Sequence, residues 1–140
     1  MPSIVAALAP DGSFWMDVAI AHHRLNLMVD TGFVDPLNRV GVALEPMLYD
    51  ALHGVGLVRR EQRRHGHDAS GHRYEVLTGI VDAQLVDPVS RAVVGPLVRV
   101  RALRGVPGVP SRVGVAFFHR LAGCRVIWEL DQRTWCIEYP

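Results

Sequence analysis

The segment Leu27–Phe33, with the sequence LMVDTGF, carries the residues best suited to chemistry in this chain of 140 residues. Its first three residues are apolar and predict a buried strand, and Asp30 follows them directly. A carboxylate at the end of a buried strand is held by rigid backbone and stays open to a substrate, so it can act as a general base or acid. Thr31 adds a hydroxyl group, and Gly32 lets a second backbone approach closely. An ordinary turn after a strand uses the same residue types, so the wider pattern has to decide between the two interpretations.

The segment resembles the active-site motif of the retropepsin-like aspartic proteases, in which apolar residues precede Asp-Thr/Ser-Gly. The family also has an apolar-apolar-Gly step and a short helix well downstream of the catalytic turn, and Arg112–Leu121 fits that pattern. It then ends in a closing hairpin, for which Cys124–Leu130 and Thr134–Tyr139 are the candidates. The resemblance extends loosely over Phe14–Tyr139, and its specific parts are the segments around Asp30 and Gly114.

The resemblance implies a catalytic turn of Asp30, Thr31 and Gly32, supported by Val113 and Gly114. Aspartic proteolysis needs two carboxylates that share one proton, so that one acts as base and the other as acid on a bound water. The sequence contains a single Asp-Thr/Ser-Gly. The second carboxylate must therefore come from a second copy, in a homodimer with the site on its two-fold axis.

The resemblance also implies which residues contact a peptide or protein substrate. The polar block Arg59–His72 predicts an exposed hairpin, placed where the family has a flap that closes over substrate. The expected substrate contacts are the residues after the catalytic turn and those at the tip of the hairpin: Phe33, Val34, Asp35, Asp68, Ala69, Ser70 and Gly71.

The sequence departs from the retroviral pattern at two places. Phe33 and Val34 stand where retroviral members often carry acidic residues, and Asp35 comes slightly later. Val115-Ala116 follow Gly114 in place of a common Arg-Asn or Arg-Asp pair. The main prediction is an aspartic endopeptidase, and the alternative is a dimeric peptide-binding or scaffold module of the same fold with weak or lost proteolysis.

The elements that position these residues are predicted to be mostly strands, because the chain is rich in Val, Gly and Pro and its apolar runs are short. Helices are predicted at Leu44–Gly54 and within Val113–Leu121. With the resemblance, the expected fold is one all-β domain over residues 1–140, a closed acid-protease-like β-barrel with a flap hairpin and with terminal strands for dimerisation. The strands expected before the closing hairpin are Ser3–Ala9, Phe14–Ala21, Leu25–Val29, Tyr74–Leu85 and Val93–Leu103.

Composition restricts the partners. Hydrophobic residues make up 49% of the chain and the net charge is +1, which argues against general disorder and against nucleic-acid or anionic-membrane partners. The run Arg59–Arg64 predicts a solvated arm. His65, His67 and His72 lie in a polar turn without a recognisable zinc pattern, so no metal and no other cofactor is expected.

Cys124 and Cys136 are expected to be free thiols. With the closing turn centred near Gln132, Cys136 opposes Ile127 or Trp128 and lies too far from Cys124 for a disulfide. No stretch approaches the roughly 18 apolar residues of a membrane helix, and the first residues lack the positive start of a signal peptide. These absences predict a cytoplasmic protein.

Overall fold

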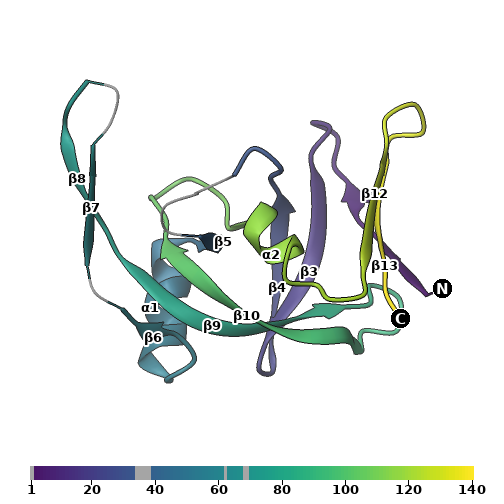
Figure 1. Cartoon of the computed structure of the whole chain (residues 1–140), viewed down its shortest axis with the longest axis horizontal. Helices are drawn as coiled ribbons and strands as arrows, with labels where there is room; N and C mark the ends of the chain where they lie inside the picture. The colour runs from purple at the N-terminus through teal and green to yellow at the C-terminus, as the bar shows by residue number, and fades with distance from the viewer. Residues whose placement is uncertain (1, 34–38, 62, 68–69) are drawn as a thin grey trace.

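The computed structural model describes residues 2–33, 39–61, 63–67 and 70–140, which fold mostly into strands with two short helices (Figure 1). Val34, Asp35, Asp68 and Ala69, four of the predicted substrate contacts, lie outside the described residues. In the described part of the chain, the largest sheet has the strand order β2-β3-β4-β11-β5-β10-β9-β6. Its strands are β2 (Ala7–Leu8), β3 (Phe14–Ile20), β4 (His23–Val29), β5 (Val40–Leu44), β6 (Arg59–Arg60), β9 (Thr78–Val86), β10 (Val93–Arg104) and β11 (Arg112–Val113).

The largest sheet turns back on itself. Strand β3 pairs with β4 from Trp15 to Ile20 and also with β9, through Val18–Leu85 and Ala19–Gln84. The pairings β3-β4-β11-β5-β10-β9-β3 therefore form a ring, and the side chains on its inner side form the core. The strands of the ring have many fully buried residues, among them Val18, Leu27, Val42 and Val100.

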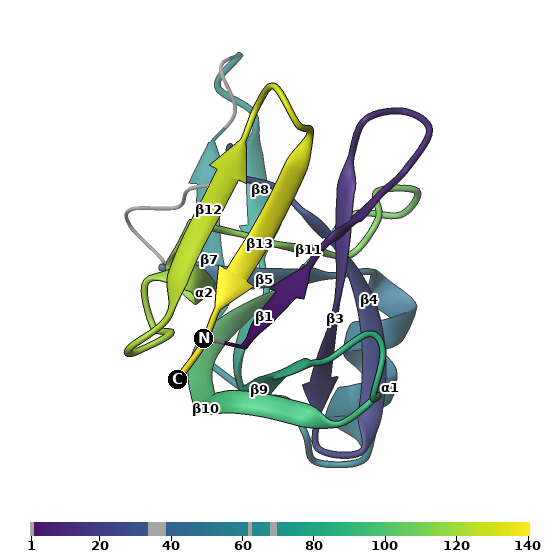
Figure 2. The same cartoon turned by 90° about the vertical axis from the view of Figure 1, so that its right-hand side faces the viewer.

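The two ends of the chain meet in a second sheet, β1-β13-β12, with β1 (Ser3–Val5), β12 (Arg125–Glu129) and β13 (Thr134–Glu138) (Figure 2). Ile4 lies opposite Ile137, and both side chains are buried within one chain. The terminal strands, expected to pair between two copies, thus already pair with each other. The predicted strand Ser3–Ala9 is split at Ala6, because β1 joins β13 while β2 joins β3.

The closing hairpin has the predicted form. Strands β12 and β13 pair antiparallel, with Cys136 opposite Ile127, and both cysteines are free. Strand β13 buries Trp135 and Ile137 against the core, and Tyr139 directly after the strand is buried too. By contrast, Val126 and Trp128 are opposite Ile137 and Trp135 but are largely exposed, on β12, the outer strand of its sheet.

Helix α1 (Pro46–Gly54) agrees with the prediction, with Pro46 at its start. The difference lies just before it, where Val40–Leu44 forms the unpredicted strand β5, buried along its whole length. Its neighbours β11 and β10 lie far away in sequence, which explains why local pattern did not reveal it. The predicted strand Tyr74–Leu85 is also divided, into β8 (Arg73–Val76) and β9.

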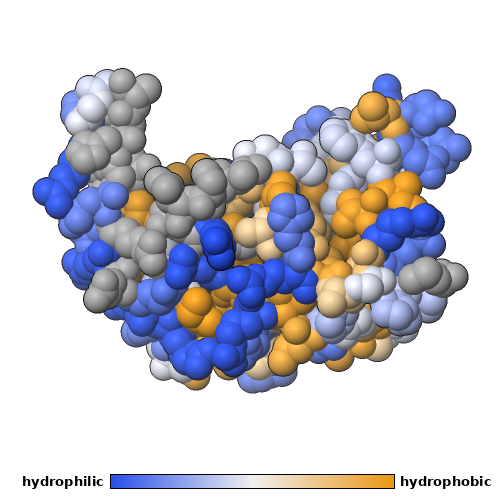
Figure 3. Space-filling view, viewed as in Figure 1, coloured by the Kyte–Doolittle hydropathy of each residue, from blue (hydrophilic) through white to orange (hydrophobic). Residues whose placement is uncertain are grey.

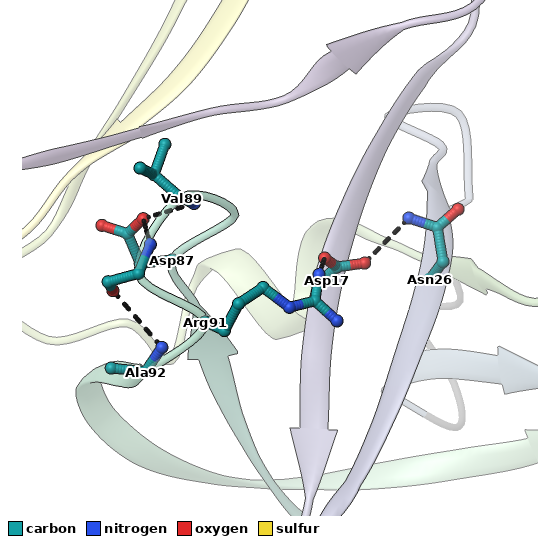
Figure 4. A network of polar contacts seen from close by, with 7 residues as sticks. Asp17, Asn26, Asp87, Val89, Arg91 and Ala92 are labelled. Carbon is teal, nitrogen blue, oxygen red and sulfur yellow. Dashed lines mark hydrogen bonds and ion pairs between the residues drawn. The ribbon is translucent and has the colours of Figure 1, made fainter.

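A polar contact ties the turn between β9 and β10 to the first hairpin (Figure 4). Arg91 extends from that turn to Asp17 on β3, with 3.2 Å between Nη1 and Oδ2, and the side-chain amide of Asn26 on β4 donates to Oδ1 of Asp17 at 2.9 Å. Asp87 stabilises the same turn by accepting from the backbone N–H of Val89 at 2.8 Å. These contacts support the β3–β9 closure of the ring.

We expect Ile137→Ala to reduce the free energy of unfolding by about 2–5 kcal/mol, because it leaves a cavity between the terminal sheet and the core. The control Val89→Ala removes a side chain that is 91% exposed and should change stability by less than about 0.5 kcal/mol. Urea denaturation of both variants measures the difference. Equal stabilities would show that the terminal sheet does not pack as described.

Candidate active site

Asp30 lies in a tight turn directly after β4, as the sequence predicts. Its backbone N–H donates to the carbonyl of Val113 at 3.0 Å, and its own carbonyl accepts from the N–H of Phe33 at 3.1 Å. The carboxylate oxygen Oδ1 accepts from the N–H of Gly32 at 3.1 Å. The turn is thus held by backbone on both sides, while the Asp30 side chain stays 29% exposed and Thr31 is exposed beside it.

The short strand β11 brings the second predicted segment to this turn. It lies between β4 and β5, parallel to the first and antiparallel to the second, with Val113 opposite both Val29 and Val42. Val113 is fully buried, so it fixes the end of β4 to the core. Helix α2 (Val115–Phe118) begins after Gly114 and buries Phe117 in the hydrophobic core.

Gly114 makes the closest approach in the site. A Cβ at this position would lie 2.5 Å from both the ring atom Cδ1 and the carbonyl oxygen of Phe33. Its backbone is extended, with φ −120°, so the need for glycine comes from space and not from an unusual conformation. The N–H of Gly114 donates to the carbonyl of Gly41 at 2.9 Å, which joins β5 to the site.

One charged residue near Asp30 was not predicted as a site residue. Nη1 of Arg112 lies 3.9 Å from Oδ2 of Asp30, and its Cζ lies 4.6 Å from the centre of the Phe33 ring. The sequence contains a signal for this residue. Arg112 stands directly before Val113-Gly114, where the apolar-apolar-Gly pattern has an apolar residue. The structure therefore brings together Asp30, Thr31, Gly32, Phe33, Arg112, Val113 and Gly114.

The predicted flap is a hairpin of β7 (Arg64–His67) and β8 (Arg73–Val76). It stands at one end of the molecule, apart from the end of β4 (Figure 1). Ser70 and Gly71 lie in its turn, where Gly71 has φ +87° and the Ser70 hydroxyl lies 2.7 Å from Nδ1 of His72. Within one chain the structure thus does not bring these two residues to Asp30.

Other residues with reactive side chains do not form a competing site among those that the structure describes. Burial raises the pKa of the Cys124 and Cys136 thiols, which disfavours their nucleophilic thiolate forms. Over the described ranges, no group of three or more His, Cys, Asp or Glu side chains lies together in a way that could hold a metal ion. In the arginine-rich arm, Arg63 pairs with Glu75 at 2.9 Å, and both side chains are well exposed. No helix of the described chain is both long and apolar enough to cross a lipid bilayer.

Comparison with known proteins places the fold. No family model matches the sequence, and no curated protein matches it. Among solved structures, the chain is similar to a retropepsin-like aspartic protease from Rickettsia conorii, with a TM-score of 0.58 and 19% sequence identity over 97% of this chain and 98% of the other. The likeness supports a retropepsin-like fold over nearly the whole chain.

We expect Gly114→Ala to destabilise the protein by about 1–3 kcal/mol or to displace the Asp30 turn, because the added methyl group meets backbone as well as a ring. Gly54→Ala is the control, since a Cβ there meets nothing within 4 Å. Thermal unfolding and amide chemical shifts of residues 30–33 report on the two effects. A Gly114→Ala protein with unchanged stability and shifts would contradict the tight contact with Phe33.

Proposed function

We propose that the protein is an aspartic endopeptidase that acts as a homodimer, with Asp30 of each copy forming the catalytic pair. The observation that carries this proposal is the partly exposed Asp30 carboxylate, fixed by backbone at the end of β4 in a retropepsin-like fold. We also interpret the ring of paired strands as the closed barrel that the sequence predicts.

In the proposed reaction the two Asp30 carboxylates hold one water and share one proton. The ionised carboxylate takes a proton from the water while the water oxygen attacks the peptide carbonyl carbon. The protonated carboxyl group donates its proton to the carbonyl oxygen. The carboxyl that took the water proton then donates it to the leaving nitrogen, while the other carboxylate takes a proton from a hydroxyl of the tetrahedral intermediate. The C–N bond breaks, and the pair again shares one proton. The Gly32 N–H holds Oδ1 of Asp30 in place, and the Thr31 hydroxyl braces the paired turns across the two-fold axis.

One chain holds half of this site, so the second copy has to face the Asp30 turn. The end of β4, the β2–β3 loop and the β12–β13 turn lie on the same upper side of the molecule (Figure 1). Beside them is a largely apolar hollow of about 560 Å³, and Figure 3 shows hydrophobic residues gathered over β12 on this side. The hollow is lined by Leu8, Ala9, Pro10, Gly12, Phe14, Trp128, Leu130 and Arg133.

For these exposed apolar side chains, burial against a second copy is more favourable than contact with solvent. Trp128 is 53% and Leu130 71% exposed, which is costly for large apolar residues unless a partner covers them. We therefore place the interface at the hollow and the Asp30 turn. The hairpin β7–β8 would close over an extended peptide, adding strand-like hydrogen bonds to those made by Phe33, Val34 and Asp35.

We expect Asp30→Asn to reduce peptide cleavage by at least about 10²-fold, because an amide cannot act as the base. The fold should persist, since the amide oxygen of the new side chain can still accept from the Gly32 N–H. Glu45→Gln is the control, an exposed carboxylate directly before α1 and outside the proposed interface. Cleavage of a peptide library by purified proteins gives the rates. Undiminished cleavage by the Asp30→Asn protein would exclude the proposed mechanism.

We expect Trp128→Glu to weaken the dimer and the cleavage rate together, because it places a charge in the proposed interface. Val89→Glu adds the same charge at an exposed position outside the hollow and should change neither. Sedimentation and cleavage assays over one dilution series measure both, and activity per chain should fall on dilution by mass action. A fully active monomer would refute the shared site, and a dimer that binds peptides without cleaving them would favour the peptide-binding alternative.

A further inference from the structure

Arg112 has an unusual position for a charged residue. It lies on β11, which pairs with β4 and β5 in the ring of strands, between the buried Ser111 and the buried Val113. Because side chains alternate along a strand, Arg112 points away from the core that Val113 enters. Its guanidinium instead lies against the Phe33 ring, beside Asp30, and the side chain is 28% exposed. A cation is thus built into the site next to the proposed catalytic carboxylate.

The Arg112 guanidinium lies against the Phe33 ring, and the described residues do not use all of its hydrogen-bonding groups. The 3.9 Å separation from Asp30 is an ion pair beyond hydrogen-bond distance. The buried Nε of Arg112 has no acceptor among the described residues. A substrate atom cannot reach the buried Nε, but the side chain is 28% exposed, and its Nη groups are the donors left to bind an acceptor. The contact with the Phe33 ring, 4.6 Å from Cζ to the ring centre, restricts the guanidinium, whose fork geometry suits a planar, two-oxygen acceptor.

The charge of the site favours the same ligand. In the proposed dimer, two Arg112 side chains flank a pair of Asp30 carboxylates that share one proton and carry one negative charge. The net charge of these groups is positive, so the site attracts a substrate carboxylate and repels a substrate ammonium group. Asp30 itself cannot be the missing acceptor, because its carboxylate has to face the water and the scissile bond.

We propose that Arg112 determines specificity by binding the carboxylate of a substrate Asp or Glu side chain next to the scissile bond. The position follows from distance, since Asp30 acts on the scissile bond and Arg112 lies within 4 Å of Asp30. The inference rests on the proposed protease function for the scissile bond, but the selection of an acidic side chain is a binding property of its own.

The test uses paired peptides that differ only in Glu or Gln at the residues flanking the cleaved bond. The wild-type protein should cleave the Glu peptide with a kcat/KM about 10-fold or more above that of the Gln peptide, mostly through KM. Arg112→Met keeps the length and loses the charge, and should bring the ratio close to one. Arg112→Lys keeps the charge but loses the planar fork, and should give an intermediate ratio.

Each other outcome counts against the proposal. A ratio near one between kcat/KM for the Glu and Gln peptides, measured on the wild-type protein, overturns the proposal. The test therefore does not depend on whether the variants fold. A lower kcat in Arg112→Met with an unchanged Glu-to-Gln ratio would show that Arg112 only supports the turn.

A second measurement separates this proposal from the protease function. Fluorescence anisotropy of the same labelled peptides on Asp30→Asn, with and without Arg112→Met, reports binding in the absence of cleavage. A preference for Glu that disappears with Arg112→Met supports the role of Arg112 even where the wild-type protein cleaves nothing. Equal binding of both peptides by the Asp30→Asn protein overturns it, even where the wild-type protein is an active protease.

Discussion

The position of the Asp30 carboxylate depends on one packing constraint, the insertion of β11 between β4 and β5. The N–H of Asp30 donates to Val113 and the N–H of Gly114 donates to Gly41, so two backbone bonds join three segments that are distant in sequence. The close contact of Gly114 with Phe33 leaves no room for a side chain. Rigid backbone of this kind holds a reacting group in place without the loss of entropy that a mobile loop would suffer on binding.

The same insertion explains the chemistry around the carboxylate. Val113 enters the core, so its neighbour Arg112 has to emerge on the side of Asp30 and Phe33. The turn therefore carries a carboxylate and a cation on one surface. In the proposed dimer, each copy supplies one acid–base group, and the apolar hollow beside the β12–β13 turn is the proposed contact with the second copy.

Local sequence pattern is sufficient for elements whose partners are near in the chain. The hairpin β3–β4, helix α1 and the closing hairpin with Cys136 opposite Ile127 follow from alternation and turn residues. The resemblance to the retropepsin-like motif is sufficient to predict that Asp30 and Gly114 share one site, without information from the structure. Strand β5 and the split at Ala6 could not be predicted, because long-range pairing determines them. Arg112 was missed as a site residue, because which side of a two-residue strand faces the site depends on both neighbouring strands.

The most direct test of the shared site is the separation of the two Asp30 carboxylates in a crystal structure of the protein at acidic pH. We predict a two-fold dimer in which these carboxylates lie about 3 Å apart or hold one water between them. Such an arrangement would supply the second carboxylate, since each sequence contains a single Asp-Thr/Ser-Gly. A monomer, or a dimer whose Asp30 carboxylates lie too far apart to contact one water, would contradict the central claim.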